Sequence, residues 1–376
     1  IQADLAMTAV ELSWVATSYL LAMAVGLIPG GKIADIHGRK KIFTFGLLVY
    51  TIGSTAAVVA GNTPVFLILR IIQGLGAALY VTTGMAILTS VFPPHRRGRA
   101  IGIYVAAVYV GLSVGPFVGG IMTQQFGWRS IFALMFPLGV TSIVVTRSFL
   151  RGEWADADSQ RLDILGCLIY GVAVVSLVYG ASILPSTPGW VLVPVGMLGL
   201  VLFFLQQRRA SDPVFEVTLF IENRTFTFSS LAALLNYSAT FALTFMMSLY
   251  LQYIKGMTPQ SAGSILMAQP VIMALFSPIA GRLSDRIEPR FLATAGMSVT
   301  AVGMVIFTQL EPHTTILAIL ANLVLLGFGF GLFSSPNMSA IMGSVEKKDY
   351  GLASGTVATM RLLGQMTSMA IATVVL

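Results

Sequence analysis

Apolar residues in this chain run in long uninterrupted stretches instead of alternating with polar ones. Long stretches contain no Asp, Glu, Lys or Arg, among them 42–69, 100–128, 164–207, 225–254, 256–281 and 291–310. A helix needs about 20 apolar residues to cross the hydrocarbon core of a bilayer. The pattern therefore predicts twelve spans, at about 13–33, 42–60, 65–91, 101–122, 130–147, 162–182, 190–206, 225–250, 263–281, 291–309, 315–340 and 352–376.

Composition and charge placement both favour an all-α polytopic membrane protein. The chain is 56% hydrophobic and only 10% charged, whereas about a quarter of the residues in a soluble domain are charged. Of its 22 Lys and Arg, eighteen fall in alternate connections: 31–41, 92–100, 147–161, 207–224, 282–290 and 341–351. The positive-inside rule places these connections in the cytoplasm. The net charge of +7 is thus a matter of topology, and no nucleic-acid partner is expected.

The two halves of the chain repeat one another. Gly31 and Asp35 correspond to Gly281 and Asp285 at an offset of 250 residues, and three further glycines recur at an offset of 253: Gly98, Gly102 and Gly111 match Gly351, Gly355 and Gly364. The pattern predicts a helix bundle at 1–147, a second at 225–376, and two additional helices with cytoplasmic connectors at 148–224. The orientation leaves both chain ends outside, so we expect one span before residue 1 and one after residue 376, fourteen in all.

The turn at 31–41 concentrates charge between two spans. Asp35 and Arg39 lie four residues apart and are expected to pair. The stretch resembles the signature loop of the major facilitator superfamily, G-x-L-A-D-x-x-G-R-K, and this resemblance implies a charge network that holds one conformation. The alternative is a basic turn that only fixes topology. The residues assigned to the latch are Gly31, Asp35, Gly38 and Arg39, with a weaker second copy at Asp285 and Arg286.

Two arginines lie inside predicted spans. A charged residue there is costly and indicates function unless the side chain reaches the headgroups. Arg70 and Gln73 resemble the superfamily motif R-x-x-Q-G-x-G-A of the fourth helix, which implies a role in proton transfer or anion handling; snorkelling to the outer headgroups is the alternative. Arg361 is the second such residue, and we expect it to face the substrate cavity.

A glycine-rich segment resembles the antiporter motif of the fifth helix, G-x-x-x-G-P-x-x-G-G, through Gly111, Gly115, Pro116, Gly119 and Gly120. Small residues on one face predict close helix packing, and the proline predicts a bend. The resemblance implies export. With Trp128–Phe132 and the turn at 251–263, the motifs resemble the fourteen-span drug:proton antiporters of the EmrB/QacA type.

Polar and aromatic residues on the expected cavity helices are the substrate-site candidates: Tyr19, Met23, Tyr109, Asn236, Phe241, Phe245, Gln269, Asn337 and Gln365. Each is also consistent with ordinary helix packing. No Asp or Glu lies in mid-span, although a proton antiporter needs a titratable group. The proton site therefore lies in a helix before residue 1, or Asp35 acts with Arg70, or the coupling differs.

The leading interpretation is proton-coupled efflux of lipophilic or cationic drugs by alternating access. The alternative is a facilitator for a specific metabolite, siderophore or organic anion; a non-transporting scaffold is disfavoured by the intact motifs. No enzymatic activity, metal site or cofactor is expected, with protons as the coupling ion and the lipid bilayer and a small-molecule substrate as partners. We expect a monomer in a prokaryotic inner or plasma membrane.

Overall fold

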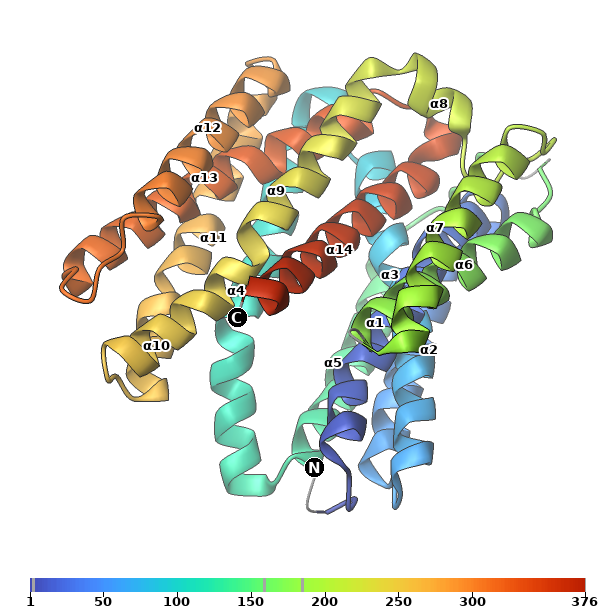
Figure 1. Ribbon diagram of the computed structural model, residues 1–376. Helices are drawn as coiled ribbons and strands as arrows, with labels where there is room; N and C mark the ends of the chain where they lie inside the picture. The colour runs from blue at the N-terminus through green and yellow to red at the C-terminus, as the bar shows by residue number, and fades with distance from the viewer. Residues whose placement is uncertain (2–3, 158–159, 184–185, 376) are drawn as a thin grey trace. The chain divides into compact units, whose positions relative to one another are not determined.

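A computed structural model describes residues 1, 4–157, 160–183 and 186–375, and every regular element in these ranges is helical. The elements up to the middle of the chain are α1 (Ala9–His37), α2 (Arg39–Val58), α3 (Thr63–Val91), α4 (Pro94–Phe126), α5 (Arg129–Phe149), α6 (Ile164–Ser182), α7 (Thr187–Gln207) and α8 (Val217–Glu222). They are followed by α9 (Arg224–Leu249), a π-helical turn (Tyr250–Ile254), α10 (Pro259–Leu266), α11 (Ala268–Ser284), α12 (Pro289–Phe307), α13 (Ile316–Gly343), a 3-10 turn (Lys347–Asp349) and α14 (Tyr350–Val375) (Figure 1).

Eleven helices among the described residues are long and apolar enough to cross a membrane. They coincide with eleven of the twelve predicted spans, and α10 and α11 together form one of them, Pro259–Ser284. The twelfth, α14, has 26 residues but is not among the eleven. This helix carries Arg361, Gln365 and several Ser and Thr residues, and these polar side chains lower its hydropathy.

The chain divides into two compact units. The first comprises Ile1–Ser90, Gly119–Asn223 and Val345–Thr359, and the second comprises Val91–Val118, Arg224–Ser344 and Met360–Leu376. The boundaries fall inside α4 and α14, so each of these helices contributes one segment to each unit. The division at 147 and 224 made from the sequence concerns repeats along the chain, and it stays a prediction.

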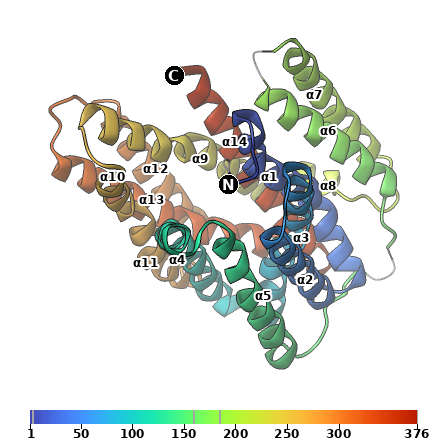
Figure 2. The ribbon, with the colours of Figure 1, turned by 90° about the horizontal axis from the view of Figure 1, so that it is seen from below.

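Within the first unit, α2 packs along α5, and α6 packs along α7 as a helical hairpin, as both ribbon views show (Figures 1 and 2). Glycines make the hairpin contact close. A Cβ atom added to Gly196 would lie 2.5 Å from the backbone nitrogen of Leu177, and one added to Gly180 would lie 2.8 Å from the Cβ of Leu192. Close backbone approach through small residues is how membrane helices associate.

Within the second unit, α13 packs against both α11 and α12, and the three lie together in Figure 2. Glycines again mark the contacts. A Cβ atom on Gly327 would lie 2.6 Å from the carbonyl oxygen of Gln269, and one on Gly296 would lie 2.5 Å from the backbone nitrogen of Phe333. The small residues of α13 therefore position this helix against two neighbours.

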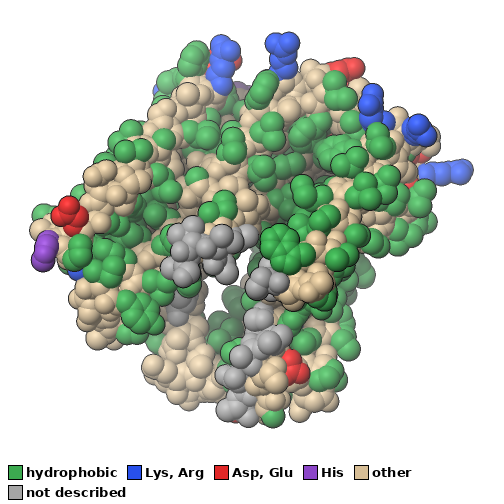
Figure 3. Space-filling model, viewed as in Figure 1, with side chains coloured by type: hydrophobic (Ala, Val, Ile, Leu, Met, Phe, Trp, Pro, Cys, Tyr) green, Lys and Arg blue, Asp and Glu red, His purple; other side chains and the backbone are tan. Residues whose placement is uncertain are grey.

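The surface of the helices is that of a membrane protein. In the face drawn in Figure 3, hydrophobic side chains cover the flanks of the helices, and Lys and Arg side chains gather at helix ends and connections. Large apolar side chains such as Trp190, Leu198 and Leu317 are 60% or more exposed. Such exposure is expected where lipid, and not water, surrounds a helix.

The structure corrects one expectation about local geometry. Most of the turn expected over 31–41 is helical: α1 continues to His37 and α2 begins at Arg39, so only one residue connects them. The connecting residue, Gly38, has a φ of 106°, a conformation that favours glycine. The close packing expected at Gly111, Gly115 and Gly119 stays a prediction: no described atom lies within 4 Å of a Cβ added at Gly111 or Gly115.

Candidate functional site

Asp35, near the end of α1, caps the N-terminus of α14. Its two carboxylate oxygens accept hydrogen bonds from the backbone amides of Gly351, at 2.9 Å, and Leu352, at 3.0 Å. The side chain is only 1% exposed. The first amides of a helix have no partner within the helix and favour a negative charge. Asp35 therefore satisfies two of these donors of α14 from outside that helix.

Two glycines allow this approach. A Cβ atom added to Gly31 would lie 2.3 Å from the carbonyl oxygen of Gly351, and one added to Gly351 would lie 2.4 Å from the carbonyl oxygen of Gly31. Real Cβ atoms are not found so close to backbone oxygens, so both positions require glycine for this backbone separation. The latch assignment of Gly31 and Asp35 thus falls on residues that meet α14 directly.

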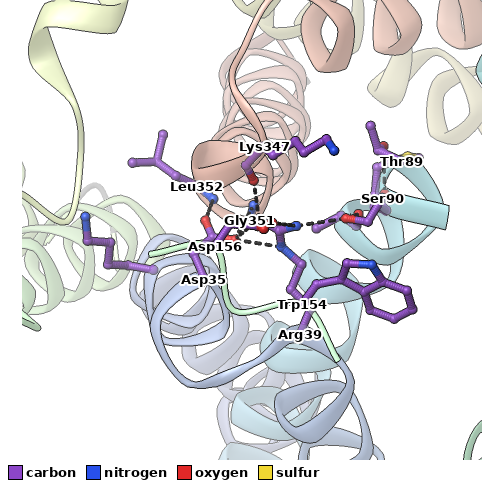
Figure 4. Close-up of polar contacts among 12 residues, drawn as sticks. Asp35, Arg39, Thr89, Ser90, Trp154, Asp156, Lys347, Gly351 and Leu352 are labelled. Carbon is purple, nitrogen blue, oxygen red and sulfur yellow. Dashed lines mark hydrogen bonds and ion pairs between the residues drawn. The ribbon is translucent and has the colours of Figure 1, made fainter. Parts of the chain in front are cut away.

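Arg39 neutralises Asp35 and extends the network (Figure 4). Its guanidinium is 0% exposed and lies 2.7 Å from Asp35 Oδ1 and 2.9 Å from Asp156 Oδ2. It also donates to Ser90 Oγ at 2.8 Å and to the carbonyl oxygen of Lys347. The pairing of Asp35 with Arg39, expected from their spacing, is confirmed. One buried cation therefore joins α1, α2, α3, the connector after α5 and the turn before α14.

The connector between α5 and α6 supplies contacts that sequence reasoning missed. Besides Asp156, the carbonyl oxygen of Trp154 accepts the backbone amide of Arg39 at 2.8 Å. The carboxylate of Glu153 accepts the amides of Lys40 and Lys41 at 2.8 and 3.2 Å and so caps the start of α2. The available signal was the acidic connector itself: the carboxylates of Glu153 and Asp156 contact an Arg- and Lys-rich turn more than a hundred residues away.

Asp285 repeats this capping in the second unit. Its carboxylate accepts the backbone amides of Gly98, at 2.7 Å, and Arg99, at 2.9 Å, at the start of α4. A Cβ atom on Gly98 would lie 2.3 Å from the carbonyl oxygen of Gly281. Arg286 is exposed, and no ion pair between it and Asp285 is found among the described residues. The second copy therefore caps a helix without a buried counter-ion.

Arg70 lies among polar and aromatic side chains of α1, α2 and α3. Its guanidinium donates to the carbonyl oxygen of Val15 at 2.8 Å and to Gln73 Oε1 at 2.6 Å. It also lies 4.5 Å from the ring centroid of Tyr19. Gln73 in turn donates to Ser54 Oγ. In this structure the side chain is therefore held within the unit by specific acceptors, and three of the predicted site residues, Tyr19, Arg70 and Gln73, form one cluster.

Arg361 lies in a cluster of tyrosines in the second unit. Its guanidinium is 5.5 Å from the ring centroid of Tyr237, and Tyr104 and Tyr109 lie near it. Phe330 contacts Tyr237 and Tyr109 with ring centroids 5.3 and 6.1 Å apart. Tyr109 Oη also lies 3.2 Å from Ser334 Oγ. Tyr104 and Phe330 were absent from the predicted site, although the spacing of seven residues between Phe330 and Asn337 on α13 was a usable signal.

The remaining cavity candidates divide by burial. Asn236, Gln269 and Asn337 are buried in the second unit; Asn337 donates to the carbonyl oxygen of Ser229 at 3.0 Å, while Asn236 Oδ1 has no hydrogen-bond partner among the described atoms. Met23 and Gln365 are half-buried. Phe241 and Phe245 are 43% and 42% exposed on α9, so the structure does not bring these two into a cluster with the others.

The glycine-rich motif of α4 forms an open face. The nearest described atom to a Cβ added at Gly119 is Ile131 Cδ1, at 4.0 Å. The backbone of Pro116 is helical, but its side chain lies outside the described residues, so the predicted bend stays a prediction. No group of three or more His, Cys, Asp or Glu residues able to hold a metal ion occurs in the described part of the chain.

The chain is similar in sequence to a known family and to individual proteins. Residues 1–163 and 229–376 match the family model described as Major Facilitator Superfamily. The chain is 30% identical over 366 residues to the riboflavin transporter RibZ of Clostridioides difficile (strain 630), covering 96% of this chain and 79% of that protein. It is 31% identical over 369 residues to the multidrug resistance protein Stp of Mycobacterium tuberculosis (strain ATCC 25618 / H37Rv), covering 96% and 68%.

Solved structures share the fold at much lower identity. The crystal structure of the human organic anion transporter MFSD10 (TETRAN) superimposes with a TM-score of 0.70 at 16% identity, covering 96% of this chain and 76% of that one. At this identity the likeness concerns the fold alone.

Proposed function

Since the chain belongs to the major facilitator superfamily, we propose that it exports lipophilic, often cationic, compounds in exchange for protons by alternating access. The observation that carries this proposal is the buried network of Asp35 and Arg39 at the start of α14. The similarity of the chain to a protein named for multidrug resistance supports the choice of substrate. The network has the properties of a latch, because its contacts depend on one another and are lost together when α14 moves away from α1.

Protonation offers a way to open this latch. Asp35 holds α14 through two amide hydrogen bonds and holds Arg39 through an ion pair. Hydrogen bonds to an ionised group are about twice as strong as neutral ones, so a proton on Asp35 weakens both sets of contacts at once. A proton that reaches Asp35 during the cycle would thereby release the start of α14.

A second candidate function, transport of an organic anion, is supported by Arg70 and Arg361. Neither guanidinium has a carboxylate within ion-pair distance among the described residues, and both lie next to tyrosine rings. An arginine in a membrane span without a protein counter-ion favours an anionic ligand. The relative RibZ is named for riboflavin, a planar ring system, and aromatic faces stack well against such rings.

Several finer assignments belong to the same proposal. We place the protein in the fourteen-span subgroup, with α6 and α7 as the additional central pair and the further spans outside residues 1–376. The eleven described spans and the hairpin packing of α6 on α7 support this assignment. The proposed setting is a bacterial plasma membrane, the proposed state a monomer, and the proposed coupling ion the proton, with no other cofactor.

The test is transport into inverted membrane vesicles that contain the full-length protein. A fluorescent lipophilic cation and riboflavin are supplied separately, with and without an imposed pH gradient. The proposal expects gradient-driven accumulation of the cation, lost in Asp35→Asn and retained in Glu311→Gln, which removes an exposed carboxylate from a loop. Accumulation of riboflavin instead, sensitive to Arg70→Gln or Arg361→Gln, favours a flavin carrier. Accumulation of neither compound by folded protein contradicts both the export of lipophilic cations and a flavin carrier.

A further inference from the structure

A basic cavity lies at the ends of α4 and α11 in the second unit. It has a volume of about 470 Å³ and is lined by His95, Arg96, Arg99, Arg282, Asp285 and Arg286. We call it the arginine pocket. Four guanidinium groups and one carboxylate give it an excess of three positive charges with His95 neutral. The helix start beside it is already capped by Asp285, so the arginines, and not the helix amides, define what the pocket binds.

Within the described part of the chain, the four arginines of the pocket, Arg96, Arg99, Arg282 and Arg286, form no ion pair with a carboxylate. The only carboxylate of the pocket has both oxygens bonded to backbone amides. Like charges gathered in one concave site repel one another unless an anion joins them. Guanidinium groups bind phosphate through paired hydrogen bonds, so the unbalanced charge points to a phosphate-bearing ligand.

Below the arginines, both helices present apolar side chains to the surroundings. Ile103 lies four residues after Arg99 on α4 and is 53% exposed. Ile279 and Leu275 lie three and seven residues before Arg282 on α11, and both are 60% exposed. Residues at these spacings share a helix face. An arginine-rich site therefore continues into two apolar stripes, which suits a ligand with a phosphate at one end and hydrocarbon at the other.

We propose that the arginine pocket binds the headgroup of an anionic phospholipid, with the acyl chains lying along Ile103 on α4 and Ile279 and Leu275 on α11. The positive-inside rule assigns this end of the helices to the cytoplasmic leaflet, where basic pockets between helices bind anionic headgroups. The lipid shields the arginines around Asp285 and thereby stabilises the contact between α4 and α11. This inference does not rest on the proposed transport function.

A second basic cavity lacks this combination. It lies in the first unit, with a volume of about 390 Å³, and is lined by Lys40, Lys41, Arg147 and Glu153 together with Thr44, Phe45, Leu48 and Gly152. Glu153 contributes a negative charge, and Lys40 Nζ donates to the carbonyl oxygen of Leu150. Its net charge is therefore lower, and it contains no cluster of guanidinium groups.

The experiment measures lipid binding to the purified full-length protein by native mass spectrometry, with phosphatidylglycerol or phosphatidylcholine of the same chain length. The test variant is Arg99→Gln/Arg286→Gln, and the matched control is Arg208→Gln/Arg209→Gln, an exposed basic pair at the end of α7. We expect phosphatidylglycerol affinity to fall on the order of tenfold or more in the test variant, since each basic residue near an anionic headgroup contributes substantially, and to change little in the control.

Three outcomes would overturn the assignment. Equal losses in both double variants would show a general effect of surface charge. Equal binding of phosphatidylcholine would show that headgroup charge is irrelevant. Displacement of phosphatidylglycerol by millimolar inorganic phosphate, with the acyl chains making no difference, would identify a soluble anion as the ligand. If the double variant fails to fold, Arg99→Lys/Arg286→Lys keeps the charge, and a partial loss with intact thermal stability still supports the pocket.

Discussion

Asp35 and Asp285 perform the same task in two units and are treated differently by their surroundings. Each carboxylate caps the start of a long helix that crosses a glycine-to-glycine contact, Gly31 with Gly351 and Gly281 with Gly98. Asp35 is buried and paired with a fully enclosed Arg39. Asp285 lies at the rim of a cavity crowded with unpaired arginines. Both carboxylates thus accept backbone amides, but of the two only Asp35 has a buried arginine as its ion-pair partner.

One residue position accounts for much of this difference. The offset of 250 residues aligns Gly38 and Arg39 with Glu288 and Pro289. Arg39 reaches back one helical turn to Asp35, whereas Pro289 has no cation to offer and begins α12. The connector that supplies Asp156 to Arg39 likewise follows only the first bundle. The comparison teaches that a repeated backbone contact leaves the electrostatics free to diverge.

The largest expected effect comes from removing the buried carboxylate. Asp35→Asn leaves the enclosed Arg39 with only the partly exposed Asp156, and breaking a buried ion pair costs about 3–5 kcal/mol. We expect a clear drop in thermal stability and loss of transport, with Asp285→Asn lowering stability much less. Thermal unfolding followed by intrinsic fluorescence measures both variants. Equal shifts for the two would contradict the contrast drawn between the sites.

Substitution of the glycine at either helix contact is expected to lower the free energy of unfolding by a similar amount. Gly31→Ala and Gly98→Ala each place a Cβ atom 2.3 Å from a backbone oxygen, and overpacking of this kind costs about 1–3 kcal/mol. Gly111→Ala is the control, because no described atom lies within 4 Å of its Cβ and alanine is favoured over glycine in a helix by about 1 kcal/mol. Destabilisation by Gly111→Ala would show that the open face of α4 is packed after all.

Exchange of the arginines separates geometry from charge. Arg39→Lys keeps the charge but cannot reach Asp35, Asp156 and Ser90 together, so we expect a loss of about 1–2 kcal/mol in the free energy of unfolding. Arg286 forms no ion pair among the described residues, so Arg286→Lys should leave thermal stability unchanged. Chemical or thermal unfolding of both purified variants provides the measurement, and a larger effect at Arg286 would reverse the comparison.

The smallest effect concerns Asp349, directly before α14. Burial raises the pKa of this carboxyl above its usual value, with Glu216 and Glu346 adding to the rise and Lys348 and Lys32 opposing it. A raised pKa means that the folded state binds more protons, so stability falls as pH rises from the unfolded pKa through the folded one. Asp349→Asn should therefore be slightly more stable than wild type at pH 8, and the gain should vanish near pH 4.

The helical spans and the Asp35–Arg39 pair followed from local information. Long apolar runs report membrane helices because lipid imposes one requirement along the whole segment, and a spacing of four residues places two side chains on one turn. The boundary at 31–41 was less accurate, since the helices continue through the charged residues and only Gly38 leaves the helical conformation.

Contacts between distant segments escaped prediction. Asp156 and Arg39 are 117 residues apart, and nothing in either segment specifies the other as its partner. Polar residues in α14 lowered the hydropathy of that helix, although its length is sufficient for a span. The contact of Asp156 with Arg39 thus depends on tertiary packing, whereas the low hydropathy of α14 is a local property of its sequence.

Because Arg39 is completely buried, the rate at which it is chemically modified reports how often the latch opens. A guanidine-specific reagent cannot reach a group that is 0% exposed, so labelling of Arg39 proceeds only during the intervals when α14 has separated from α1. The rate of its modification, read by mass spectrometry of the peptide that contains it, therefore counts openings directly, and does so without a bound substrate or a fluorescent probe.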